Sequence, residues 1–90
     1  MIQIIDKRGS GKTSRLMLLA KENNAKFVCA NPHAMESKAK AYGLEGITFI
    51  SYRDFITSYD RDKYVIDEVD EFLRSIMGDS TLLGYSLTLE

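Results

Sequence analysis

The sequence predicts a single α/β domain with a mostly parallel sheet of about five strands, covered by helices on both faces. Short apolar runs of strand length alternate along the chain with segments whose apolar residues recur at helical spacing. A helix between consecutive strands is the usual connection between parallel strands. The chain has 90 residues, which suffice for one compact domain (residues 1–90) with short elements and short loops. Strands are expected at residues 2–5, 26–30, 47–50, 64–67 and 81–89.

Four helices are expected between these strands, with recognisable start or stop signals. The first follows a Gly-rich segment and ends near Asn23-Asn24, residues that tolerate a left-handed cap. The second begins at Asn31-Pro32, because Asn is a good N-cap and Pro fits the first helical turn. The third follows Ser51, which together with Asp54 resembles a capping box. The fourth covers residues 69–78 and ends at a glycine.

Composition excludes several classes of function. The 12 Lys and Arg against 13 Asp and Glu give a net charge of −1, which argues against a strongly basic nucleic-acid-binding surface. The single cysteine, Cys29, permits no internal disulfide and no multi-cysteine metal site. No apolar run approaches the ~18 residues of a membrane span, so no membrane partner is expected. The first residues lack the basic region of a signal peptide, and we therefore expect a cytoplasmic protein.

The segment Asp6–Thr13, DKRGSGKT, has the strand–loop–helix context of a phosphate-binding loop. In the Walker A pattern G-x-x-x-x-G-K-[ST], backbone N–H groups surround a phosphate at a helix N-terminus. Lys12 would reach the terminal phosphates, and the Thr13 hydroxyl would ligate Mg²⁺. Asp6 replaces the opening glycine, and the alternative interpretation is a flexible Gly-Ser turn. The expected nucleotide-binding residues of this loop are Arg8, Gly9, Ser10, Gly11, Lys12, Thr13 and Ser14.

A second acidic motif follows the apolar run Val65-Ile66. Asp67 would lie at the carboxyl end of a strand, in the crevice that the first strand–helix loop also lines, and would help to hold Mg²⁺. Glu68 would orient and polarise the attacking water. The alternative interpretation is that Asp67-Glu68 caps the next helix and complements its dipole.

Together these motifs resemble those of P-loop NTPases, and within that class those of superfamily 2 helicases. Asp67-Glu68-Val69-Asp70 looks like their motif II, and Leu82–Thr88 is similar to their motif III. The resemblance implies a three-layer α/β/α RecA-like core, ATP and Mg²⁺ as cofactors, catalytic roles for Lys12 and Glu68, and γ-phosphate sensing by Ser86 and Thr88. ATP is the default nucleotide because no guanine-specific N/T-K-x-D segment is present.

The resemblance covers only the first of the two domains that such helicases use. Their second domain supplies arginine fingers and half of the nucleic-acid track, and it would begin where this sequence ends, at Glu90. We therefore expect weak hydrolysis that depends on a protein partner or on a homo-oligomer, with nucleic-acid binding possible but less supported. The alternative is a non-catalytic interaction module, such as a helicase or ATPase decoy that keeps the fold. Candidate fingers acting on a neighbour are Arg53, Arg61 and Arg74, although a solvated face explains each of them too.

Overall fold

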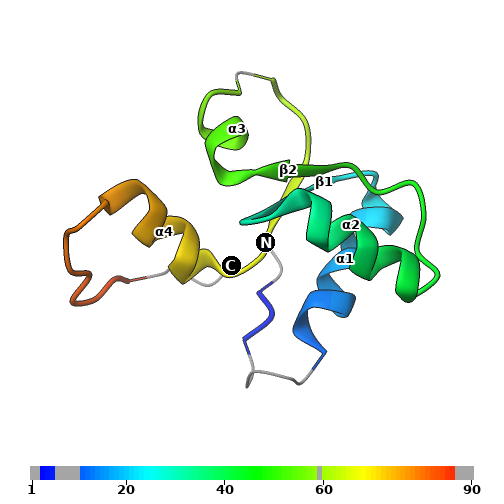
Figure 1. Ribbon diagram of the computed structural model, residues 1–90, viewed down its shortest axis with the longest axis horizontal. Coiled ribbons are helices and arrows are strands. Elements are labelled where there is room, and N and C mark those ends of the chain that lie inside the picture. The colour runs from blue at the N-terminus through cyan, green and yellow to red at the C-terminus, as the bar shows by residue number, and fades with distance from the viewer. Residues whose placement is uncertain (1–2, 6–10, 59, 87–90) are drawn as a thin grey trace.

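A computed structural model describes residues 3–5, 11–58 and 60–86 of the chain (Figure 1). Helices and strands alternate through most of this length, as the sequence predicts. The elements in chain order are α1 Lys12–Asn23, β1 Lys26–Cys29, α2 Pro32–Ala41, β2 Phe49–Ser51, α3 Tyr52–Ile56, β3 Tyr64–Ile66 and α4 Val69–Met77.

The three strands form one parallel sheet in the order β2-β1-β3. Phe27 of the central strand β1 lies opposite Phe49 of β2 and opposite Val65 of β3. The chain passes from β1 to β2 through α2, and from β2 to β3 through α3. The predicted α/β class with parallel strands is therefore confirmed, and all three strands end at the same edge of the sheet.

The hydrophobic core lies on the sheet face that carries Phe27 and Cys29, which are almost completely buried. Met17 and Ala20 of α1 pack into this core together with Ala39 of α2. Because successive side chains of a strand point to opposite faces, Val28 points to the other side of the sheet, where it is fully buried. Cys29 is a free cysteine buried in this core.

An aromatic cluster connects α3, β3 and α4. The ring of Phe72 in α4 makes edge-to-face contacts with Tyr52 and Phe55 of α3, at centroid distances of 5.3 and 5.7 Å. Phe55 in turn contacts Tyr64 at the start of β3, at 4.9 Å. Edge-to-face pairs at such distances stabilise a fold by more than the burial of their apolar surface alone would. They hold the end of β2 and the start of α4 in a fixed relation to each other.

Helix boundaries agree with the cap residues expected from the sequence. The Asn31 side chain accepts a hydrogen bond from the Ala34 N–H at 3.1 Å, and Ser51 does the same for Asp54. Asn24 ends α1 in the left-handed conformation, with φ of 54°. The third helix is short, with 5 residues, and ends at Ile56.

The structure differs from the prediction at the two outer strands. Residues 3–5 and 81–86, which are the described parts of the segments 2–5 and 81–89, lie outside any strand. Ile5 and Leu83 are 81% and 96% exposed, so these apolar side chains are not packed against the sheet. An apolar run becomes a strand only when a neighbouring strand pairs with it, and pairing depends on tertiary context that local pattern does not contain.

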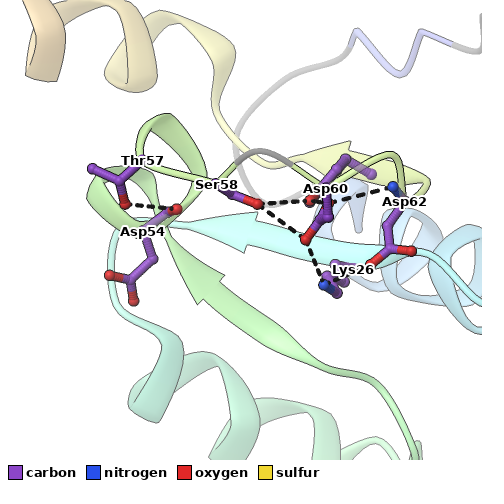
Figure 2. A network of polar contacts seen from close by, with 7 residues as sticks. Lys26, Asp54, Thr57, Ser58, Asp60 and Asp62 are labelled. Atoms are coloured by element: carbon purple, nitrogen blue, oxygen red, sulfur yellow. Dashed lines mark hydrogen bonds and ion pairs between the residues drawn. The ribbon is translucent and has the colours of Figure 1, made fainter.

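A polar network fixes the opposite, amino-terminal edge of the sheet (Figure 2). Lys26, at the start of β1, forms ion pairs with Asp60 at 3.0 Å and with Asp62 at 2.7 Å. Asp60 also accepts hydrogen bonds from Ser58 and from the Tyr64 hydroxyl. The bond to Asp62 is the main cause that raises the pKa of Lys26, and the bond from Tyr64 is the main cause that lowers the pKa of Asp60. The network joins the connection before β3 to the start of β1.

Candidate functional site

The two motifs that the sequence singles out meet at the carboxyl edge of the sheet. Thr13 lies in the first turn of α1, and Asp67 directly follows β3. The Thr13 hydroxyl donates a hydrogen bond to the Asp67 carboxylate, with 3.4 Å between Oγ1 and Oδ1. This distance is at the long end of hydrogen bonding. The two residues that are expected to hold a magnesium ion are 54 positions apart in sequence, and the fold brings their oxygens together.

The main chain of Asp67 is held on both sides. Its N–H donates to the Val28 carbonyl of β1 at 2.9 Å, which continues the β1–β3 pairing beyond the last strand residue. Its carbonyl accepts a hydrogen bond from the Tyr52 hydroxyl at 2.8 Å. Asp67 is only 9% exposed. The position of its carboxylate is therefore determined by the central strand and by α3, and little freedom remains beyond the side-chain torsions.

The surroundings of Asp67 disfavour its negative charge. Burial raises the pKa of the Asp67 carboxyl above its ordinary value, and the neighbouring Glu68 raises it further. The hydrogen bond from Thr13 and the positive charge of Lys38 act in the opposite direction, but they do not cancel the increase. A buried carboxylate with a raised pKa would be stabilised by a bound cation.

A glycine in the left-handed conformation directly precedes α1. Gly11 is the N-cap and adopts the left-handed conformation, with φ of 84°, which an L side chain rarely accepts. The Ser14 hydroxyl donates to the Gly11 carbonyl at 3.0 Å, so it fixes this turn. No acidic residue occupies the first turn of α1. The positive end of the helix dipole lies at this turn, and Lys12 and Thr13 beside it are half-buried.

Glu68 occupies a strained position between β3 and α4. Its φ of 55° is in the left-handed region, which is uncommon for a residue other than glycine. Glu68 is the N-cap of α4, yet its side chain makes no capping hydrogen bond. The structure thus does not support the alternative in which this carboxylate serves to cap the helix.

A shallow crevice of about 510 Å³ opens at the same edge of the sheet. Ser51, Tyr52 and Arg53 line one side of it, and Glu71, Arg74 and Ser75 of α4 line the other. Arg53 and Arg74, two of the three arginines expected as candidate fingers, therefore border the same crevice. Tyr52 also lines this crevice, and its hydroxyl donates a hydrogen bond to the Asp67 carbonyl. Both arginines are exposed, and Arg74 lies 3.8 Å from Asp70 on its own helix.

Several of the predicted site residues are not placed by the structure. Arg8, Gly9, Ser10 and Thr88, together with Asp6, lie outside the described residues. Ser86 is described, and it lies exposed in the segment after α4, outside any helix or strand. In Figure 1 this segment extends beyond α4, on the side of the molecule away from α1.

Among residues 3–5, 11–58 and 60–86, no group of three or more His, Cys, Asp and Glu residues is arranged to hold a metal ion. No helix in the same part of the chain has both the length and the apolar character of a membrane span.

Sequence reasoning missed two residues that act on Asp67. Neither Tyr52 nor Lys38 of α2 is among the site residues expected from the sequence. The available signal was position, since Tyr52 comes two residues after the predicted strand 47–50 and Asp67 is the last residue of the predicted strand 64–67. Carboxyl ends of parallel strands share an edge. Hydrogen-bonding side chains at these ends are therefore candidates for mutual contact.

Replacing Asp67 by Asn is expected to stabilise the ligand-free protein near pH 8. The folded-state pKa of Asp67 is raised, so the folded chain binds this proton more tightly than the unfolded chain does. Wild-type stability is therefore lost as the pH rises from the unfolded pKa of about 4 through the raised folded pKa. Asp67→Asn should lack this part of the pH dependence, because an amide does not titrate.

Urea denaturation followed by circular dichroism at about pH 4 and about pH 8 measures this effect. Asp79→Asn, at an exposed position, serves as the control. An Asp67→Asn protein that is less stable than the wild type at the higher pH would contradict the electrostatic account of the site.

Comparisons of the chain with protein-family models, with curated proteins and with solved structures gave no match. The function is therefore inferred from the residues of this chain. The contact between Thr13 and Asp67 is the observation on which that inference depends.

Proposed function

We propose that this chain is a P-loop nucleotide-binding domain that takes ATP together with Mg²⁺. The contact between Thr13 and Asp67 carries the proposal, because it joins the end of the DKRGSGKT segment to the acidic residue after an apolar strand. A flexible Gly-Ser turn that merely contains a lysine would have no reason to lie beside a buried carboxylate. The left-handed Gly11 and the first turn of α1 without acidic residues support the same function.

The residues present fit a nucleotide with its metal ion. The backbone at Gly11 and the start of α1 would bind phosphate oxygens, with Lys12 contributing positive charge. Thr13 and Asp67 would be the protein ligands of Mg²⁺, which neutralises charge on the phosphates when it is bound. Magnesium ordinarily keeps waters and takes phosphate oxygens as further ligands, so two protein oxygens are sufficient.

We propose further that the sheet is a partial form of a RecA-like core. Among the described residues, β3 pairs with β1 alone, so one side of β3 has no strand beside it. The apolar segments 2–5 and 81–89 have the length and composition of strands, and they are the candidates to extend the sheet there. Ser86 and Thr88 would then approach the nucleotide, as the resemblance to helicase motif III implies.

Hydrolysis is proposed to be slow in the isolated domain. Glu68 would orient the attacking water, and its lack of a capping hydrogen bond is compatible with that role. P-loop enzymes without an arginine finger lose about 10³ to 10⁵ in rate. A partner protein, or a second copy of this chain, would supply the missing group.

One observation favours a second candidate, a module that binds another protein without catalysis. Helix α4 has no buried residue, and its Val69 and Ile76 are 46% and 55% exposed. Exposed apolar side chains that recur on one helix are typical of a surface for another polypeptide. In this alternative, the P-loop fold would remain without measurable affinity for ATP.

Lys12→Ala is expected to abolish binding of Mg-ATP. Isothermal titration calorimetry should detect micromolar binding to the wild type and at least about a 100-fold loss in Lys12→Ala, because a charge-assisted contact to phosphate is removed. Lys21→Ala, at the other end of the same helix, is the matched control and should bind like the wild type.

The result separates the two candidate functions. If both the wild type and Lys12→Ala are folded by circular dichroism and neither releases heat with Mg-ATP, the nucleotide-binding function is wrong and the protein-binding alternative is favoured. If both bind equally well, ATP lies at a different site.

Glu68→Gln is expected to lower ATP hydrolysis by about 100-fold or more while Mg-ATP still binds. The amide has the shape of the carboxylate but cannot polarise water by accepting its proton. Phosphate release should be measured over a range of protein concentrations, with Glu45→Gln at an exposed loop position as the control. Turnover that is indifferent to Glu68→Gln would remove this residue from the mechanism.

A further inference from the structure

The Tyr52 hydroxyl lies against the main chain of both acidic residues of the site. It donates to the Asp67 carbonyl at 2.8 Å in a buried contact, and it lies 3.4 Å from the Glu68 carbonyl. We propose that Tyr52 is a positioning residue, whose hydroxyl fixes the backbone turn at Asp67-Glu68 so that the Asp67 carboxylate faces Thr13. This inference rests on the proposed function, because it assigns to Tyr52 a role in the same metal site.

The Tyr52 ring is itself fixed, which a positioning residue requires. It is 8% exposed and packs edge-to-face on Phe72 of α4 at 5.3 Å. Tyr52 is the first residue of α3, directly after β2, so the end of a strand anchors its backbone. Burial, together with the nearby acidic groups, raises the pKa of the Tyr52 phenol well above its ordinary value. Because a backbone carbonyl only accepts hydrogen bonds, the Tyr52 hydroxyl is the donor in both contacts.

The turn that Tyr52 holds is one that needs support. Glu68 has a positive φ of 55°, and such a conformation persists in a non-glycine residue only where the surroundings determine it. The Glu68 carbonyl also accepts the N–H of Phe72 at 3.0 Å, at the start of α4. The Val28 carbonyl holds the preceding N–H of Asp67. Two of these three hydrogen bonds join backbone groups, and the third comes from the side chain of Tyr52. Tyr52 belongs to a separate element, α3.

Fixing the carboxylate serves metal binding more than phosphate binding. Phosphate is expected to contact Gly11, Lys12 and the start of α1, an element that follows a different segment of the chain from the one that carries Tyr52. The Asp67 carboxylate, in contrast, belongs to the residue whose main-chain carbonyl accepts the hydrogen bond from Tyr52. Groups that orient a metal ligand typically change metal affinity by about 10- to 100-fold when they are removed.

Tyr52→Phe tests the inference, because it removes the hydroxyl and keeps the ring that packs on Phe72. Tyr64→Phe is the matched control, since it removes the hydroxyl that bonds to Asp60 at the opposite edge of the sheet. The measured quantity is the ratio of the ATP dissociation constant in EDTA to that in Mg²⁺, obtained by calorimetry. Circular dichroism selects a temperature at which all three proteins are folded.

We expect Tyr52→Phe to lower this ratio by about tenfold relative to the wild type, with the dissociation constant in EDTA changed by less than about twofold. Tyr64→Phe should keep the wild-type ratio. An unchanged ratio in Tyr52→Phe overturns the inference, and so does an equal weakening in Mg²⁺ and EDTA, which would show a purely structural role. A wild type that binds no ATP overturns the proposed function and this inference together, so the two failures are distinguishable.

Discussion

The hydrogen bond from the Asp67 N–H to the Val28 carbonyl is the contact on which the arrangement of the site depends. It extends the pairing of β1 and β3 by one residue beyond the strand, and so delivers an acidic side chain to the edge of the sheet where α1 begins. Val28 is fully buried in the central strand, so this anchor is part of the rigid core. That placement explains three features of Asp67: its side chain contacts Thr13, its carboxylate is nearly buried, and its carbonyl accepts the hydrogen bond from Tyr52.

The same placement has an energetic cost that a ligand could offset. Asp67 is nearly buried and lies beside Glu68, and both conditions disfavour its charge in the ligand-free protein. Glu68 adds backbone strain at the same turn. A disfavoured charge and a strained backbone in two adjacent residues are typical of functional sites. A ligand that binds there can offset the free-energy cost of both. Elsewhere, at the amino-terminal edge of the sheet, Lys26 lies between Asp60 and Asp62, so each of these two carboxylates has a cation within ion-pair distance.

Much of this architecture could be predicted from local pattern, and the exceptions have physical reasons. Cap residues such as Asn31 and Ser51 act through bonds within three positions, so the sequence alone locates the helix starts. The expected meeting of Thr13 and Asp67 is observed, although residues 3–5 before α1, which were expected to form one of the two parallel strands, lie outside any strand. The outer strands, in contrast, depend on a pairing partner, and Leu83 is almost fully exposed instead. The hydrogen bond from Tyr52 to the Asp67 carbonyl depends on how the start of α3 is placed beside the end of β3, and this placement is tertiary.

The most direct test of the account is to ask whether one metal–nucleotide complex contacts both motifs at once. Titration of Mn²⁺-ATP into ¹⁵N-labelled protein broadens the NMR signals of amides close to the ion. We predict early broadening at Gly11–Ser14 and at Asp67-Glu68 in parallel, while the amides of Asp60 and Asp62 at the opposite edge stay sharp. Broadening at only one of the two segments, or first at the opposite edge, would contradict a shared metal–nucleotide site at Thr13 and Asp67.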